Sequence, residues 1–389
     1  MVRLKKMMFQ VMGVFVVFMF LLPTSVISQV RGITKDKVKV GAYQPLTGIL
    51  AAEAKQVVDG VRAYFSHVND GGGVNGRKIE YLVENDNYDP QQAVAAAKKL
   101  VERDQIFAMV APLGTVTGMA VLPYLIKQNV PLVTTLSGSK ELLDSKESLI
   151  FGVMLVGNEA GEAAVEWAIG ALKPKKAAIF FQNDKFGKDG KDGIEQTLRK
   201  HGIDIVAIEG HLVTDTDLSS VVVKMRQANP DTVFMYSIPK PAAMFLKEAQ
   251  KMGWKPNFVG CNPIAHPDTG KLAGDAVNGL KVVFYTALGD STNPLVVEKV
   301  KILKKYAPDT TVGYYAFHGM VGAILLVEGL KRAGSNPTVE SFIKGMETLN
   351  DFDIGLVPPI TYASGKHRGA SRFAAAEWRE NRMVIIRNW

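Results

Sequence analysis

Short apolar runs that resemble β-strands alternate with helical patterns along almost the whole chain, and this alternation constrains the fold most strongly. Residues 38–43 form a strand-like run, and 78–83 form the next one. Between them, apolar residues recur at helical spacing over 57–68, so they share one helix face. Repeated β-α units imply parallel sheets with helices on both faces, joined by right-handed crossovers. The sequence therefore predicts an α/β fold of doubly wound parallel sheets.

The β-α units fall into two successive sets, which indicates two lobes. A chain of 389 residues suggests about two domains at roughly 100–200 residues each. A long helical region at about 312–350 precedes a β-rich tail, as expected if the chain crosses between the lobes more than once. We expect lobe 1 to comprise 35–153 and 287–350, and lobe 2 to comprise 154–286 and 351–389, joined by a multi-crossing hinge.

The amino terminus has the pattern of a secretory signal peptide. Three basic residues within the first six positions precede an apolar run at 11–22, which Pro23 ends. Compact residues at 26–28 suit a cleavage site, so we expect 1–28 to be removed on export and the mature chain to begin near Gln29. The alternative is an uncleaved anchor, but about a dozen apolar residues fall short of the roughly 20 that span a bilayer.

The charge balance argues against a nucleic-acid partner. Without the leader the chain keeps 43 basic side chains (the 46 of the full chain less three) against 38 acidic ones. These charges form no run of one sign, whereas nucleic-acid-binding proteins normally carry clustered basic stripes. The single cysteine, Cys261, cannot form an internal disulfide. We expect it to be a half-buried residue after a strand, without special reactivity.

Signatures of enzymes and metal sites are scarce. The six histidines are scattered, none lies four residues from another, and no HExxH motif occurs. The glycine-rich stretch 71–76 follows a helix and precedes a strand, which is the reverse of the order in a phosphate-binding loop. We interpret it as a turn that ends a helix. The sequence thus predicts a non-enzymatic protein with no metal and no cofactor.

Small polar residues follow two predicted strands. Gly114 and Thr115 come after one strand and open a helix, and Leu136, Ser137 and Gly138 come after the next. In open α/β sheets, ligands bind beyond the carboxyl ends of the strands. Glycine permits close approach, hydroxyls donate hydrogen bonds, and a helix amino terminus favours a negative group. Together the two sites can hold a carboxylate. The alternative is ordinary helix capping by Thr115 and Ser137.

Several motifs, taken in order, resemble the type I periplasmic binding proteins of the branched-chain amino-acid class. They lie at 40–48, 69–77, 89–93 and 183–187, and the likeness runs from about residue 35 to the end. The resemblance implies a receptor in the periplasm that closes on a small ligand and delivers it to the membrane permease of an ABC transporter. We expect a monomer. A ligand-sensing subunit of a regulatory system remains the alternative.

The resemblance also implies roles for individual residues. Gly114 and Thr115 match the pair that holds the ligand carboxylate, and Leu136, Ser137 and Gly138 match the backbone-and-hydroxyl loop beside it. The other implied ligand-binding positions carry large side chains: Glu53 in the first loop, Phe186 and Tyr236 in lobe 2, and Tyr314 near the hinge.

The chain departs from that pattern at Asn262. Amino-acid binders of this class usually have a glutamate there for the ligand ammonium, and a buried ammonium without a compensating charge costs several kcal/mol. Asn262 cannot supply that charge, although Glu53 or Asp184 could. The ligand is therefore either a branched-chain or other amino acid or, as we favour, an aromatic or other carboxylate that is not an amino acid.

Overall fold

The computed structural model describes residues 30–143, 149–369 and 372–389. The expected signal peptide and Gln29 lie outside this part of the chain. Within it, the predicted α/β class is confirmed, because the strands form two mainly parallel sheets of five and seven strands.

The first sheet is entirely parallel, with the order β2-β1-β3-β4-β5. Its central strands carry small and β-branched side chains that are buried on both faces, as parallel sheets require. The strands are β1 (Lys37–Gln44), β2 (Lys78–Asn85), β3 (Ala108–Val110), β4 (Leu132–Val133) and β5 (Ile150–Phe151).

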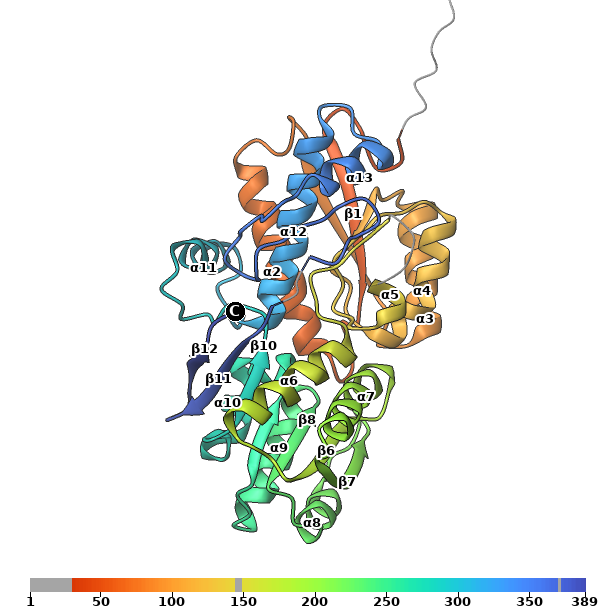
Figure 1. Cartoon of the computed structure of the whole chain (residues 1–389). Coiled ribbons are helices and arrows are strands. Elements are labelled where there is room, and N and C mark those ends of the chain that lie inside the picture. The colour runs from red at the N-terminus through yellow and green to blue at the C-terminus, as the bar shows by residue number, and fades with distance from the viewer. Residues whose placement is uncertain (1–29, 144–148, 370–371) are drawn as a thin grey trace, which may run out of the picture. The chain divides into compact units, whose positions relative to one another are not determined.

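Seven α-helices belong with this sheet in the described part of the chain, and α2 packs lengthwise on α12 (Figure 1). Asp89 caps α3 by accepting hydrogen bonds from the amides of Gln91 and Gln92, as the Asp-Pro pair predicts. The helices are α2 (Ala51–Asp70), α3 (Pro90–Lys98, continued by a π-helical turn, Lys99–Arg103), α4 (Thr115–Lys127), α5 (Lys140–Leu143), α11 (Pro294–Tyr306), α12 (Tyr314–Ala333) and α13 (Val339–Glu347).

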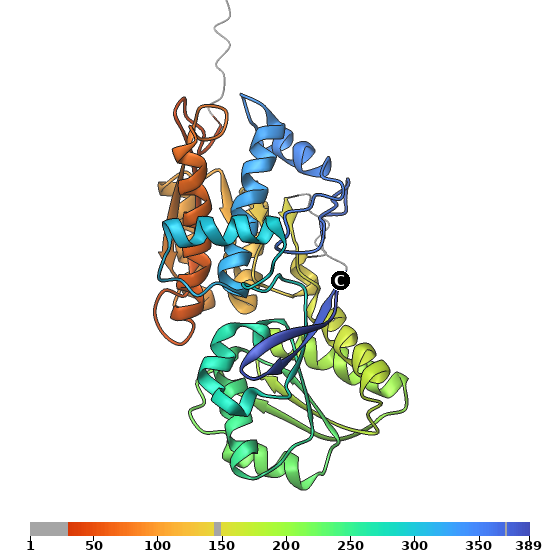
Figure 2. The same ribbon diagram turned by 90° about the vertical axis from the view of Figure 1, so that its left-hand side faces the viewer.

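The second sheet has the order β12-β11-β10-β9-β8-β6-β7, and only the pairs β10–β11 and β11–β12 are antiparallel. These last two strands form the dark blue ribbon in Figure 2. The strands are β6 (Lys176–Gln182), β7 (Asp204–His211), β8 (Thr232–Tyr236), β9 (Asn257–Gly260), β10 (Lys281–Phe284), β11 (Ala374–Arg379) and β12 (Arg382–Arg387). Its helices are α6 (Gly157–Ala171), α7 (Lys185–Lys200), α8 (Ser219–Gln227), α9 (Pro239–Lys251) and α10 (Pro267–Ala273), with 3-10 turns at Asn262–Ala265 and Gly274–Val277.

Three segments connect the two sheets, which agrees with the predicted multi-crossing topology. They follow β5, β10 and α13 in the chain. The third, which we expected to accompany the tail in lobe 2, first returns to the first sheet. Arg368 forms a bridge with Gly152 next to β5, and the Tyr362 hydroxyl donates to the Gly152 carbonyl at 3.1 Å. The chain then enters β11.

Two helical regions differ from the sequence expectation. The long helical region at 312–350 is two helices, because Gly334, with φ of +83°, ends α12. The polar stretch 289–294, whose composition predicts a loop, leads directly into α11, which we did not predict. The Asn293 side chain accepts from the Leu295 amide, so the polar stretch that resembled a loop contains the helix cap.

Candidate functional site

A cavity of about 50 Å³ lies between residues of the two sheets, beyond the carboxyl ends of several strands. The side chains that form it are uncharged. They are Leu50, Tyr88, Leu113, Gly114, Thr115 and Leu136 from the first sheet and its connections, Met154 from a crossing segment, Gln182, Phe186, Ile238 and Pro263 from the second, and Tyr314 and Tyr315 at the start of α12. We call this cavity the cleft.

Gly114 and Thr115 form the polar end of the cleft. Gly114 has φ of +128°, and a Cβ atom there would clash with Thr117 Oγ1 and lie 2.9 Å from the Tyr88 ring, so only glycine fits. Thr115 is the first residue of α4 and is 2% exposed. No side chain caps α4 among the described residues, so ordinary capping is not the role of Thr115. The first amides of α4 and the Thr115 hydroxyl are thus suited to an anion.

The loop after β4 supports this polar end from behind. Leu136 lines the cleft, whereas Ser137 and Gly138 are buried beside it. The Gly138 carbonyl accepts from the Gly157 amide at 2.6 Å, which ties the loop to the start of α6. Ser137 Oγ accepts weakly from the Ser139 amide at 3.4 Å. Neither Ser137 nor Gly138 is part of the cavity wall.

The second sheet contributes an aromatic wall. Phe186 lines the cleft, and its ring centroid lies 5.0 Å from that of Tyr236. Tyr236 is buried at the end of β8 and packs beneath Gly190, where a Cβ atom would overlap the tyrosine ring. Tyr236 is outside the wall and supports Phe186 from behind.

Asp184 joins the two sides of the cleft. Its carboxylate accepts from the Gly187 amide at 3.1 Å, which caps α7, and from Gln182 Nε2 at 2.6 Å. It also accepts from the Tyr88 hydroxyl at 3.1 Å, across from the first sheet. Burial, followed by the charge of Asp184, raises the pKa of Tyr88 well above its usual value. We considered the Asp184 carboxylate as a partner for a ligand ammonium, but these three hydrogen bonds already occupy it.

Asn262 is held by backbone and presents a donor. Its Oδ1 accepts from the Tyr285 amide at 2.7 Å. Its Nδ2 is buried and has no hydrogen-bond partner of good geometry in the described chain. An NH₂ group donates hydrogen bonds, so it suits a carboxylate or carbonyl oxygen and not an ammonium. Asn262 is itself outside the cleft wall, and the next residue, Pro263, lines the cleft.

Glu53 lies in the first turn of α2, outside the cleft wall. One of its carboxylate oxygens, Oε2, is buried without a partner in the described regions. Burial raises the pKa of Glu53, with a further contribution from the charge of Asp268. Among the carboxylates that we predicted near the ligand, Glu53 is the one with an oxygen free to pair with a cation.

Sequence reasoning missed several residues of the wall. Tyr88 follows Asn87, and both residues have positive φ, of +58° and +50°, so a strained turn directs the tyrosine. Gln182 ends β6, and the strand-end rule that selected Thr115 could have selected it. No local pattern marked Ile238 or Tyr315.

Two further contacts connect the sides of the cleft. Lys185 pairs with Glu141 of α5 at 2.8 Å, and this hydrogen bond lowers the pKa of Glu141 to about 2. Gln56 Nε2, on α2, donates to Asp268 Oδ2, on α10, at 3.0 Å.

Catalytic and metal chemistry gain no support from the side chains. The described residues contain no group of three or more His, Cys, Asp or Glu arranged to hold a metal ion. Cys261 is buried, more so than we expected, and burial raises the pKa of its thiol to about 12, so it stays protonated. In the same regions, no helix has both the length and the apolar character that a bilayer span requires.

A family model and a sequence relative indicate the same protein family. A family model described as periplasmic binding protein matches residues 37–382. A Leu/Ile/Val-binding protein of Citrobacter freundii is 23% identical over 345 residues, which cover 88% of this chain and 91% of that protein.

Solved structures show the same fold. A branched-chain amino acid ABC transporter structure from Thermus thermophilus, with bound valine, has a TM-score of 0.84 at 22% identity and covers 91% of this chain and 96% of that one. A fatty acid ABC transporter substrate-binding protein from Thermomonospora curvata has a TM-score of 0.83 at 23% identity, with 92% and 93% covered.

Proposed function

The chain belongs to the periplasmic binding protein family, whose members are non-catalytic solute-binding proteins, and we propose that it captures a small monocarboxylate in the cleft. The bound acid would be delivered to the permease of an ABC uptake transporter. The periplasm is the proposed location, and it rests on the family together with the signal-peptide pattern.

The uncharged wall of the cleft carries this proposal. A carboxylate can be stabilised there without a cationic side chain, because the amino terminus of α4 and the Thr115 hydroxyl supply donors. An ammonium has no such partner, because the lining residues include no acid. Since an unpaired buried ammonium costs several kcal/mol, we favour a carboxylate without one.

The rest of the wall indicates the kind of tail. Phe186, Ile238, Pro263 and Met154 are apolar, and Tyr314 adds an aromatic face with one hydroxyl. These side chains suit a branched aliphatic or aromatic tail. The names of the two structural relatives fit this range, since valine and fatty acids share a carboxylate and an aliphatic body. An amino-acid ligand would require Glu53 to turn toward the cleft.

A thermal-shift screen of the purified chain against aliphatic acids, aromatic acids, amides and amino acids tests the proposal. A ligand at 100 times its dissociation constant should stabilise the fold by about 2.7 kcal/mol. The Thr115→Val variant should lose about half or more of this stabilisation for the best acid. If no member of the panel stabilises the wild-type chain, capture of a small carboxylate is contradicted.

A further inference from the structure

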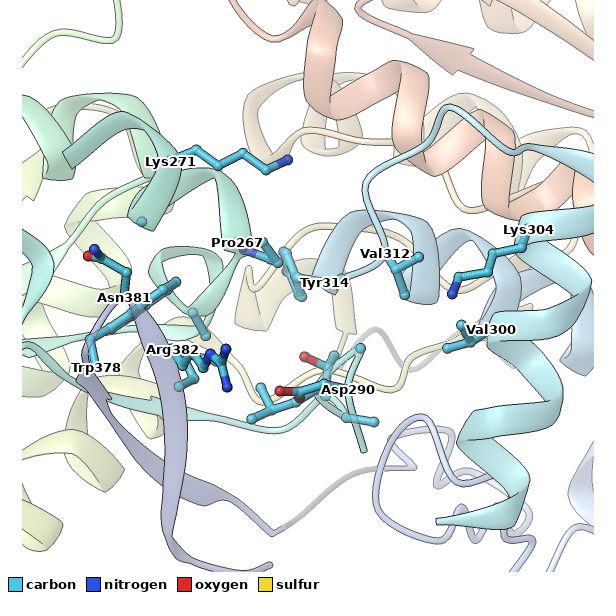
Figure 3. Close-up of a pocket in the computed structure, with 18 of the residues that line it drawn as sticks. Pro267, Lys271, Asp290, Val300, Lys304, Val312, Tyr314, Trp378, Asn381 and Arg382 are labelled. Carbon is cyan, nitrogen blue, oxygen red and sulfur yellow. The ribbon is translucent and has the colours of Figure 1, made fainter. Parts of the chain in front are cut away.

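A second cavity, of about 650 Å³, adjoins the segment that crosses from β10 to α11. Its walls come from α10 and the β11–β12 ribbon on one side, and from α11 and residues 312–314 on the other (Figure 3). Cavities of about 300–1,000 Å³ are typical of small-molecule sites. We call it the rear cavity, and none of the roles proposed above uses it.

Much of the rear cavity is lined by apolar side chains. Leu288, Val300 and Val312 contribute aliphatic surface, and Trp378 contributes an indole. Trp378 is 4% exposed, and its Nε1 is buried with no hydrogen-bond partner among the described residues. A buried indole N–H usually has an acceptor. Because this N–H is itself inaccessible to solvent, a bound molecule would contact the indole ring and not the N–H.

The charged residues around this apolar interior are mostly cationic. Lys304 projects from α11 and Arg382 from β12, on different sides of the cavity (Figure 3). Neither side chain makes an ion pair or a hydrogen bond with another described residue. Lys271 also borders the cavity but is bonded to Asp268 at 2.9 Å and Thr311 at 3.2 Å, and Asp290 is the one acidic residue that lines it. The lining therefore contains two unpaired cationic side chains, Lys304 and Arg382, and one acidic side chain, Asp290.

We propose that the rear cavity binds an amphipathic monoanion, with its carboxylate toward Arg382 and an aliphatic body that passes Trp378 and extends to Val300 and Val312. A short anion would gain nothing from the apolar interior, and a neutral hydrocarbon would gain nothing from the two cations. A medium-chain fatty acid combines both features, and we take dodecanoate as the probe.

This site would be coupled to the cleft. Tyr314 lines both cavities, and the walls of the rear cavity come from elements of both sheets. A molecule that contacts both walls holds them in the present arrangement, in which the cleft is narrow. By linkage, dodecanoate should raise the affinity of the cleft for its own ligand, at the low end of the roughly 5- to 150-fold range of allosteric coupling.

Calorimetric titration of the full-length exported chain with dodecanoate tests the site. Val300→Trp should fill the cavity and abolish binding, whereas Val297→Trp, at an exposed position of the same helix, should leave it unchanged. The double variant Lys304→Gln/Arg382→Gln should weaken binding about three- to tenfold. The control Lys301→Gln, also exposed on α11, should not.

Nuclear magnetic resonance of ¹⁵N-labelled protein locates the probe. The indole signal that Trp378→Phe removes should shift on addition of dodecanoate and stay in place on addition of acetate. Binding that persists in Val300→Trp and is lost in Thr115→Val would assign dodecanoate to the cleft and overturn the second site. The second site would also be overturned if dodecanoate did not bind to the wild-type chain. Because Thr115→Val reports on the cleft alone, failure of the rear site is distinguishable from failure of the proposed function.

Discussion

The two walls of the cleft differ in what they present to a ligand. The first wall offers backbone and a hydroxyl, at Gly114 and Thr115, in positions set by the end of a strand and the start of α4. The second offers replaceable apolar side chains, chiefly Phe186, Ile238 and Pro263. If the proposed function holds, the fold itself would provide carboxylate binding, and side chains of the second wall would determine which tail is accepted.

The largest expected effect comes from adding a charge directly behind the uncharged second wall, next to Pro263. Asn262→Glu would bury a carboxylate that has no cation nearby, at a cost of several kcal/mol, so binding of the native acid should weaken by more than a hundredfold. Calorimetry on the best ligand from the screen measures this. The opposite pattern, a mild Asn262→Glu together with a severe Glu53→Gln, would show that Glu53 pairs with a ligand ammonium.

Removing the hydroxyl from the first wall should have the next largest effect. Thr115→Val should cost about 1.5–3 kcal/mol, or roughly ten- to a hundredfold in affinity, because a charge-assisted hydrogen bond is lost. The matched control is Thr117→Val in the same helix, since the Thr117 hydroxyl donates to the Leu113 carbonyl and is outside the cleft wall. Equal affinities of the Thr115→Val and wild-type chains would mean that the hydroxyl does not contact the acid.

Truncating the second wall should change selectivity between tails. Phe186→Ala should weaken binding of a bulky acid by about 1.5 kcal/mol, from the lost apolar contact, and leave a short acid such as propanoate nearly unaffected. The ratio of the two dissociation constants is the measurement. A uniform loss for both acids would indicate that Phe186 positions the first wall and does not read the tail.

The smallest effect concerns the Glu141–Lys185 pair between the walls. Because the pKa of Glu141 is about 2 in this arrangement and 4.5 when unpaired, the pair favours the narrow cleft above pH 4.5 and is lost as the pH falls toward 2. The pair is partly exposed, so its contribution should be about 0.2–1 kcal/mol. Glu141→Gln should therefore weaken binding up to about fivefold at pH 7, and the difference from wild type should vanish in acid. A difference that is undiminished at pH 3 would assign Glu141 another role.

The sequence predicted the first wall better than the second. Gly114, Thr115 and Leu136 follow from a rule that joins local pattern to sheet topology, so the residues alone could identify them. Phe186 and Tyr314 came from family resemblance. Tyr88, Ile238 and Tyr315 escaped prediction because their side chains meet the cleft only after distant segments pack. Likewise, Asp184 is recognisable as a helix cap, but its bond to Tyr88 crosses between sheets.

The central claim is that the cleft recognises a carboxylate and no ammonium, and a pair of ligands that differ only in the amino group tests it directly. 4-Methylpentanoate is leucine without that group. Isothermal titration of the wild-type chain with both should give tighter binding of 4-methylpentanoate, by tenfold or more, because the leucine ammonium would be buried without a partner. Tighter binding of leucine, with loss of that preference in Glu53→Gln, would contradict the account.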